Sequence, residues 1–136
     1  MTVTTHVGIA IVEADGKVLV GLRQSQDSLH GKAEFPGGKC EPGELPRACA
    51  VRECQEETSI VVLPHELLTT VTHQYEYGTV ELHFWLCVPA HAASETSNPS
   101  GLFRWIPFSE MLKLDFPEGN REALRLLAER QQNQPS

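Results

Sequence analysis

Two short apolar segments open the chain, and polar residues that favour a turn separate them. Residues 6–12 are dense in apolar and β-branched side chains, residues 14–17 interrupt this pattern, and residues 18–22 are apolar again. Short apolar runs on either side of an Asp-Gly pair are typical of a β-hairpin. We therefore expect two antiparallel strands at the start of the chain, followed by a polar loop over residues 23–32.

Two longer apolar segments in the middle of the chain predict two further β-strands. Residues 61–71 form one segment, which Pro64 interrupts, and residues 80–88 form the other. The second segment is largely apolar at both its odd and its even positions, which is typical of a central strand covered by helices on both faces. After a polar connection over residues 90–101, a short strand is predicted at residues 102–106.

Helical periodicity predicts two amphipathic helices. The first covers residues 45–58 and has Pro46 in its first turn, where the missing amide hydrogen costs little. Its apolar face is formed by Ala50, Val51 and Cys54. The second covers residues 118–130 and has an apolar face formed by Leu124, Leu127 and Ala128.

The order of these elements predicts an α/β fold, in which helices cover both faces of a mixed β-sheet as an α/β/α sandwich. A chain of 136 residues with 40% apolar residues is large enough for an ordinary core. Since no linker or internal repeat divides it, we expect one domain over residues 1–136, with a disordered tail over residues 131–136.

The composition limits the partners of the protein. A formal net charge of −7 argues against stable binding to nucleic acid, which requires clustered Lys and Arg, but is compatible with a free nucleotide. The apolar N-terminal run is too short for a membrane span and lacks the basic start of a signal peptide, so a cytoplasmic protein without membrane attachment is predicted. We expect a monomer, with a dimer as the alternative.

The four cysteines show no paired CxxC spacing, and we interpret them as reduced thiols, with zinc ligation as the weaker alternative. They are Cys40, Cys49, Cys54 and Cys87.

Residues 38–60 are unusually rich in glutamate. Side chains three or four residues apart are neighbours on a helix, and like charges there destabilise it by a few tenths of a kcal/mol per pair. A divalent cation turns this repulsion into shared coordination, and hard cations prefer oxygen ligands. Glu53, Glu56 and Glu57 are therefore the predicted metal ligands, with Mg²⁺ as the cofactor and Mn²⁺ as the alternative ion. The competing interpretation is a solvated acidic helix.

The same segment resembles the sequence box of the Nudix hydrolases, G-x5-E-x7-R-E-U-x-E-E-x-G-U, in which U is an apolar residue. The matching residues are Gly38, Glu44, Arg52, Glu53, Cys54, Glu56, Glu57 and Ile60. Fixed spacing over such a length is far more specific than a lone glycine motif. The resemblance implies the same sandwich fold and cleavage of a phosphoanhydride bond.

Outside the box, residues 34–39 and 115–120 resemble the MutT branch of the family, which hydrolyses nucleoside triphosphates to a monophosphate and pyrophosphate. This resemblance implies hydrolysis of 8-oxo-dGTP, which would remove oxidised guanine nucleotides from the precursor pool. Two alternatives stay open: the same chemistry on a modified pyrimidine triphosphate, and a non-catalytic nucleotide sensor.

Three residues of the box are candidates for the chemistry itself. We expect Glu53 to act as the general base, although spacing alone does not decide which glutamate accepts the proton. Arg52 is expected to hold Glu44 or Glu53 in place, because a planar guanidinium fixes a carboxylate better than a lysine does. An ordinary surface salt bridge is the alternative for Arg52. A backbone carbonyl of Gly37 or Gly38 is implied by the resemblance as a further metal ligand.

The resemblance also implies a set of substrate-binding residues outside the acidic helix. They are Arg23, Glu34, Phe35, Pro36, Lys39 and Asn120. In the MutT branch the asparagine reads the purine edge, and Lys39 could reach a phosphate as a point charge. The alternatives are a helix N-cap for Asn120, an exposed lysine for Lys39 and a core position for Phe35.

Two positions depart from the family pattern. Ser59 replaces the glycine that normally ends the helix, so strain or a different C-cap is expected there. The loop near Asn98 lacks the acidic residue that many relatives have, and Glu95 is the candidate substitute. In the polar loop over residues 23–32, Ser28 and His30 are alternative matches to a single position of the family pattern.

Overall fold

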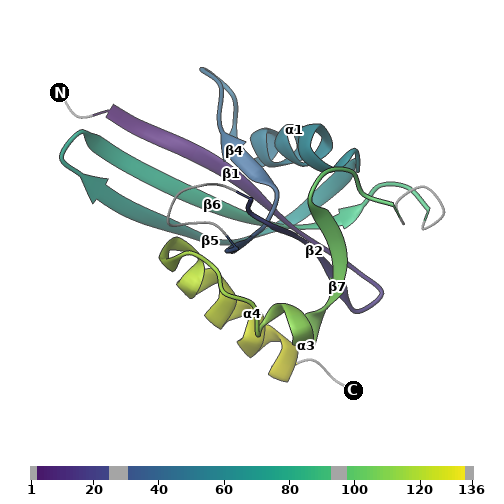
Figure 1. Cartoon of the computed structure of the whole chain (residues 1–136). Coiled ribbons are helices and arrows are strands. Elements are labelled where there is room, and N and C mark those ends of the chain that lie inside the picture. Colours follow the sequence, from purple (N-terminus) through teal and green to yellow (C-terminus); the bar gives the residue numbers. More distant parts are fainter. Residues whose placement is uncertain (1–2, 25–30, 93–97, 134–136) are drawn as a thin grey trace.

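The sheet contains three long strands, of which one, β5 (Val62–Tyr75), lies at its edge. The computed structural model describes residues 3–24, 31–92 and 98–133, here called the described segments. Strand β1 (Val3–Ala14) pairs in parallel with β6 (Gly78–Pro89), and β6 pairs antiparallel with β5. The predicted central position of β6 is therefore confirmed (Figure 1).

Shorter strands extend the sheet on the other side of β1. The predicted hairpin is confirmed, because β2 (Lys17–Leu22) pairs with the end of β1. Strand β2 also pairs with β3 (Ala33–Glu34) and with β7 (Phe103–Pro107). Strand β4 (Gly37–Lys39) pairs antiparallel with β1. Strands β3 and β4 were not predicted, because two or three residues are too few to show a periodicity.

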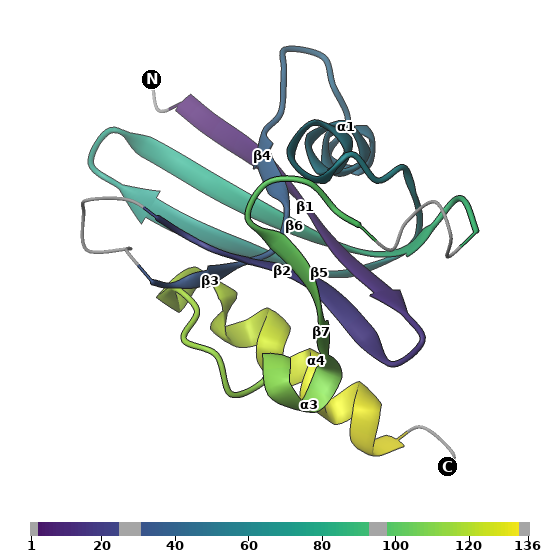
Figure 2. The ribbon, with the colours of Figure 1, turned by 45° about the vertical axis from the view of Figure 1, so that its right-hand side comes forward.

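Helices cover both faces of this mixed sheet, which confirms the predicted α/β/α arrangement (Figures 1 and 2). Helix α1 (Pro46–Thr58) lies on one face, with Pro46 in its first turn as predicted. Helices α3 (Phe108–Met111) and α4 (Arg121–Asn133) lie on the other, and the 3-10 helix η1 (Glu118–Asn120) leads into α4.

Alternate side chains of β1 and β6 supply two separate cores. The core on the α4 face includes Ile11, Phe84, Leu86 and Leu127, and that on the α1 face includes Val12, Ala50, Cys54 and Cys87. A strand that is buried on both sides needs apolar residues at every position. The apolar face predicted for α1 is thus confirmed, with Val51 partly buried beside it.

Helix α1 rests directly on β1 at a glycine. A Cβ atom on Gly8 would lie 2.6 Å from the carbonyl oxygen of Pro46 and 2.7 Å from the amide nitrogen of Ala50. Real Cβ atoms do not approach so closely, so any larger residue would push the helix off the strand. Gly8 therefore determines how near the acidic helix lies to the sheet.

Two predicted boundaries near the C-terminus are wrong. The predicted helix over residues 118–130 is divided into η1 and α4, since Gly119 is a poor residue for a regular helix. Helix α4 then continues to Asn133, because Gln131 and Gln132 are good helix formers. The predicted disordered tail is therefore wrong for residues 131–133, and residues 134–136 lie outside the described segments.

Strand β5 is longer than predicted and continues from Val71 to Tyr75. It accommodates Pro64 at a register shift next to β6, which frees the proline from donating a ladder hydrogen bond. Helix α3 was not predicted because it has only four residues.

The four cysteines are free thiols. Helices of the described segments are all too short or too polar to cross a membrane.

Candidate functional site

Arg52 lies in an acid cluster, which consists of Arg52, Glu53, Glu56 and Glu57 on α1 and of Glu44 just before the helix. The guanidinium donates to both carboxylate oxygens of Glu44, at 2.8 Å from Nε and 2.9 Å from Nη2. Its Nη1 donates to Glu53 Oε1 at 3.0 Å and to Glu56 Oε1 at 3.2 Å. Arg52 thus contacts both carboxylates that the sequence proposed for it, and it is more than a single surface salt bridge.

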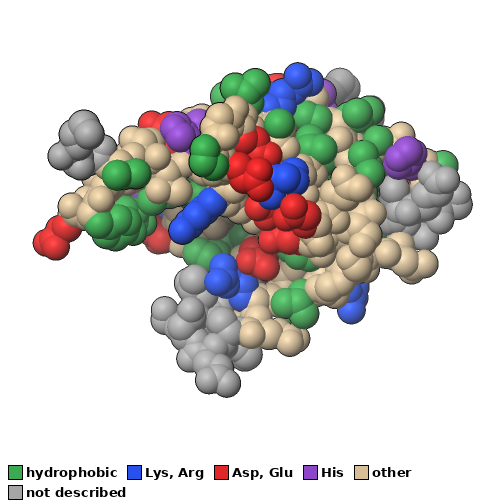
Figure 3. Space-filling model, turned by 90° about the horizontal axis from the view of Figure 1, so that it is seen from above, with side chains coloured by type: hydrophobic (Ala, Val, Ile, Leu, Met, Phe, Trp, Pro, Cys, Tyr) green, Lys and Arg blue, Asp and Glu red, His purple; other side chains and the backbone are tan. Residues whose placement is uncertain are grey.

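Figure 3 shows this face of the molecule, on which acidic side chains gather around a basic one beside a hollow.

Glu44 is fixed as a carboxylate by its partners. Hydrogen bonds from Arg52, and then the backbone N–H of Glu41, lower the pKa of Glu44 to about 2. In return, the hydrogen bonds with Glu44 raise the pKa of Arg52 above its usual value. Glu44 and Arg52 therefore stay charged at neutral pH, and this ion pair can restrain the remaining acids of the cluster.

The surroundings of Glu57 disfavour the charged form of its carboxylate. Burial raises the pKa of Glu57 to about 7, and the charges of Glu34, Glu53 and Glu56 act in the same direction. The N–H of Gly37 donates to Glu57 Oε1 at 2.9 Å and partly compensates. A half-buried carboxylate among other carboxylates is the environment that a bound cation stabilises.

The three predicted metal ligands do not close into a compact group. Two sets of His, Cys, Asp and Glu ligand atoms lie within 4.8 Å of one another in the described segments, and neither contains Glu53, Glu56 or Glu57. Glu53 and Glu56 instead share Nη1 of Arg52. The acids lie in the last turns of α1, where the helix dipole favours a cation. Their oxygen donors suit a hard divalent ion once the side chains turn toward one another.

Strand β4 brings its backbone against the carboxylate of Glu53. A Cβ atom on Gly38 would lie 2.5 Å from Cδ of Glu53, so another residue here would displace the acid. Gly37 and Gly38 form no sharp turn, because both residues lie in β4 and neither has a positive φ. The glycines are needed for close approach alone. That the carbonyl oxygens of these glycines bind the metal remains a prediction. The carbonyl of Gly38 accepts a hydrogen bond from Cys49 Sγ at 3.2 Å.

The predicted substrate-binding residues differ in burial: Arg23 and Glu34 are partly buried, whereas Phe35 and Pro36 lie in the core. Arg23 and Glu34 form an ion pair at 3.4 Å, and burial raises the pKa of Glu34 against the opposing effect of Arg23. Phe35 is 6% exposed and stacks on Phe116 with ring centroids 4.9 Å apart. Pro36 is fully buried. The structure therefore places Phe35 in the core, as its alternative interpretation expected.

Asn120 lies at the end of η1, beside β5. Its side-chain amide donates to the carbonyl of Pro117 at 3.3 Å, and its side-chain oxygen accepts no hydrogen bond within the described segments. This arrangement does not support the N-cap alternative, which requires that oxygen to bind a helix N–H. The side-chain oxygen of Asn120 remains available to a ligand.

His73 adds a polar atom to the same region. Its Nε2 is buried without a hydrogen-bond partner in the described part of the chain, and a Cβ atom on Gly119 would lie 3.5 Å from it. An unpaired buried nitrogen is costly, so a ligand that binds it is favoured. His73 lies two residues after Val71, so strand alternation places it on the same face of β5 as Val71, which packs against the core.

Further polar and aromatic residues are exposed or lie outside the described segments. Lys39 is exposed, and its carbonyl accepts a hydrogen bond from Arg52 at 3.2 Å. Tyr75 and Tyr77 are exposed and stack on each other at 5.1 Å. Ser28, His30 and Glu95 lie outside the described segments.

Ser59 ends α1 in the left-handed conformation that its position predicted. Its φ is 67°, its N–H donates to the carbonyl of Gln55 at 2.9 Å, and its hydroxyl lies 2.9 Å from that of Ser100. Left-handed backbone strains a residue with a side chain, and the hydroxyl contact provides the different cap. The departure from glycine is thus accommodated at the end of α1.

Comparison with known proteins agrees with this geometry. Residues 2–127 match the NUDIX domain. A CTP pyrophosphohydrolase of Escherichia coli strain K12 is 33% identical over 104 residues, which are 76% of each chain. An 8-oxo-dGTP diphosphatase of the same strain is 27% identical over 123 residues, covering 90% of this chain and 95% of the relative. The solution structure of the E. coli ORF135 protein has a TM-score of 0.77 and 27% identity, and the match covers 99% of this chain and 96% of that one.

A mixed sheet between helices, with an arginine-centred acid cluster on one of them, defines a hydrolase of phosphoanhydride bonds. The chain belongs to the Nudix family. Its substrates are nucleotides, and members of the family generally use a divalent metal.

Proposed function

We propose that the protein is a Mg²⁺-dependent nucleoside triphosphate pyrophosphohydrolase of MutT type. It hydrolyses 8-oxo-dGTP to the monophosphate and pyrophosphate, and thereby removes oxidised guanine from the pool of DNA precursors. The observation that carries the chemistry is the acid cluster, in which Arg52 restrains Glu44 and Glu53 beside β4. The cytoplasmic location, the monomeric state and the single domain over residues 1–136 remain predictions.

Glu53, Glu56 and Glu57 would hold the Mg²⁺, with a carbonyl of Gly37 or Gly38 as a further ligand. When bound, a divalent cation neutralises charge on phosphate oxygens and makes a water more acidic. Glu53 accepts the proton of the attacking water, and its hydrogen bond with Arg52 keeps the carboxylate in position. The side chain of Lys39 makes no ion pair within the described segments, so its ammonium can bind a phosphate.

The region around Asn120, His73, Arg23 and Glu34, here called the base region, supports the choice of purine. Oxidation of guanine at C8 places a hydrogen on N7 and turns an acceptor into a donor. The side-chain oxygen of Asn120 can accept from that donor, whereas unmodified guanine would oppose one acceptor with another. A site built for such a bond can reject the wrong base by about 10⁴-fold.

The direct test measures pyrophosphate release from 8-oxo-dGTP, dGTP and CTP in the presence of Mg²⁺. We expect the kcat/KM for 8-oxo-dGTP to exceed that for dGTP by several orders of magnitude. Equal turnover of the two guanine nucleotides would exclude the oxidised-guanine assignment. Absence of Mg²⁺-dependent pyrophosphate release from every triphosphate tested would exclude the pyrophosphohydrolase itself.

A pyrimidine triphosphate is the second candidate substrate. The similarity to a CTP pyrophosphohydrolase, at 33% identity, favours it. The chemistry at the acid cluster would be the same, because it acts on the phosphates and not on the base. Preferential hydrolysis of CTP or a modified cytidine triphosphate in the same assay would select this candidate.

A further inference from the structure

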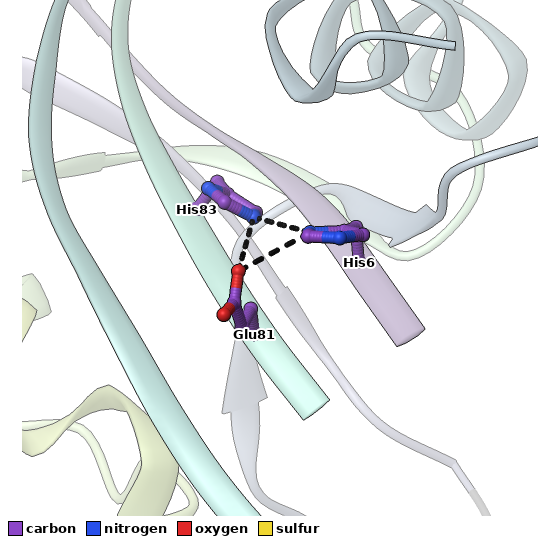
Figure 4. A group of neighbouring side chains, drawn as sticks. All are labelled: His6, Glu81 and His83. Carbon is purple, nitrogen blue, oxygen red and sulfur yellow. Dashed lines mark hydrogen bonds and ion pairs between the residues drawn. The ribbon is translucent and has the colours of Figure 1, made fainter. Parts of the chain in front are cut away.

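A second group of metal-ligating side chains lies on the sheet, outside the acid cluster. It consists of His6 on β1 and of Glu81 and His83 on β6, and the three side chains point toward one another (Figure 4). His6 Nδ1 lies 3.0 Å from His83 Nε2 and 3.3 Å from Glu81 Oε2. His83 Nε2 lies 3.7 Å from the same oxygen. Three potential donor atoms of two chemical types thus surround one point.

The parallel register of β1 and β6 assembles this group. His6 is paired with Glu81, and Gly8 is paired with His83. Glu81 and His83 are two residues apart, so they project from the same face of β6. His6 lies on the face of β1 from which Gly8 meets the first turn of α1. The three side chains therefore lie on the α1 face of the sheet, held by backbone on two strands.

The spacing of the donor atoms fits a tetrahedral ion. Zinc bonds to histidine nitrogen and carboxylate oxygen are about 2.0–2.1 Å long, which separates tetrahedral ligands by about 3.3 Å. The three observed separations, 3.0, 3.3 and 3.7 Å, lie around that value. Imidazole nitrogens suit Zn²⁺ and other late transition ions, whereas Mg²⁺ prefers oxygen alone. The donor set therefore differs in its metal preference from the acid cluster on α1.

A neighbouring hydroxyl orients His83 as a ligand. Thr70 Oγ1 lies 3.3 Å from His83 Nδ1, the ring nitrogen that faces away from the group. Metal-binding histidines commonly bond their second nitrogen in this way, which fixes the ring and its tautomer. The side chain of His83 is 14% exposed and that of His6 is 43% exposed, so one side of the group is open to solvent.

We propose that His6, Glu81 and His83 bind one divalent ion of the zinc class, with a fourth position open to water or another small ligand. The ion links β1 to β6 beside Gly8, where α1 rests on the sheet. The site is separate from the proposed Mg²⁺ ligands and does not depend on which nucleotide the enzyme hydrolyses. A histidine pair that is merely hydrogen-bonded to Glu81 is the competing description, and it predicts no specific affinity for zinc.

Calorimetric titration of the full-length protein with Zn²⁺, at saturating Mg²⁺ to occupy the acid cluster, tests the proposal. We expect one ion per chain, with an affinity that falls by about 100-fold or more in His83→Asn and in Glu81→Gln. Thr70→Val should weaken binding by about 10-fold, since it removes the partner of His83 alone. The matched control is His65→Asn, which changes an exposed histidine of β5 and should leave the affinity unchanged.

Two further variants keep the result decisive. Cys40, Glu44 and Cys49 also place ligand atoms within 4.8 Å of one another, so Cys40→Ser identifies zinc bound there instead. If His83→Asn does not fold, His6→Asn at the more exposed position replaces it. The absorption spectrum of bound Co²⁺ then provides a second measurement of four-coordinate ligation. Loss of zinc binding in Cys40→Ser but not in His6→Asn would overturn the proposal. So would an equal loss in His65→Asn, or no zinc binding by the unmodified protein.

Discussion

The acid cluster and the base region are assembled in opposite ways. The acid cluster comes from one helix and the loop before it, and its side chains already bind one another through Arg52. The base region collects residues from β3, β5, η1 and the segment after β2, and it leaves the Nε2 of His73 without a partner in the described segments. The difference indicates that the reaction is encoded locally, whereas the choice of base depends on the whole fold.

A consequence is that chemistry and selectivity can be changed separately. The variants below test this separation, and each is expected to affect one region while the other continues to function.

Glu53→Gln should have the largest effect and should act on the chemistry alone. We expect kcat to fall by about 10²–10⁴-fold, because the amide cannot accept the proton of the attacking water. The ratio of kcat/KM between 8-oxo-dGTP and dGTP should not change. Glu41→Gln is the matched control, since Glu41 is an exposed acid in the loop before α1. Pyrophosphate release measures both quantities, and a collapse of the selectivity ratio would show that the two regions are coupled.

Asn120→Ala should act on the base region and leave the chemistry intact. We expect kcat/KM for 8-oxo-dGTP to fall by about 10- to 100-fold, as one hydrogen bond to the base is lost, with little change for dGTP. Asn133→Ala, at an exposed position in α4, is the control. An equal loss on both substrates in steady-state assays would mean that Asn120 does not read the base.

The pH dependence of stability should sharpen the description of the acid cluster. Glu57 has a pKa of about 7 in the folded protein against an ordinary value of 4.5, chiefly because it is buried. The folded state therefore holds a proton that the unfolded chain releases between these two values. This contribution to stability is complete below pH 4.5 and is lost as the pH rises through 7. Denaturant unfolding without divalent ions should show a falling free energy of unfolding across that window.

Glu57→Gln isolates this effect from other titrating groups, among them His83, whose lowered pKa acts in the opposite direction. The difference between the two proteins should fall with pH across the window. Added Mg²⁺ should reverse the trend in the unmodified protein, because metal binding requires the carboxylate. A difference that does not vary with pH would show that Glu57 titrates normally.

Ser59→Gly should have the smallest effect and should act on neither region directly. Glycine relieves the strain of the left-handed backbone at the end of α1, so we expect the free energy of unfolding to rise by about 1 kcal/mol. Loss of the hydroxyl contact with Ser100 reduces this gain. Thermal unfolding should show a rise of a few degrees in Tm. Ser59→Ala is the control, because it removes the hydroxyl but keeps the strain. If Ser59→Gly lowered kcat substantially, the helix end would be part of the catalytic geometry.

Periodicity predicted the parts of the fold that are long and regular. The central position of β6 and the buried face of α1 were both recognised, because each repeats its apolar pattern over several turns or residue pairs. Strands β3 and β4 were missed because their ends are set by pairing with β2 and β1 and not by a pattern of their own. The glutamates and Arg52 of α1 could also be recognised, because they lie close together in the sequence at fixed spacings.

Residues that meet through distant pairing were not found from the sequence. His73 is unpaired only in the context of Gly119, which packs against β5 from another part of the chain. His6 is an ordinary polar residue until the parallel register brings it opposite Glu81. The close approach at Gly8 likewise appears only when α1 lies on β1. These residues could not be recognised from the sequence because their neighbours in the fold are distant along the chain, and not because their chemistry is unusual.

The parallel pairing of β1 with β6 affects how the protein can fold during synthesis on the ribosome. Strand β1 is synthesised well before β6, and it pairs with β6 from Val3 opposite Gly78 to Val12 opposite Cys87, so this distant partner must emerge before the sheet can close. Until then one edge of β1 is unprotected, and such an edge can recruit other nascent chains. Pairing over so long a span also slows folding. We expect premature termination before Gly78 to yield aggregation-prone fragments, and the antiparallel β5–β6 hairpin to form before β1 docks.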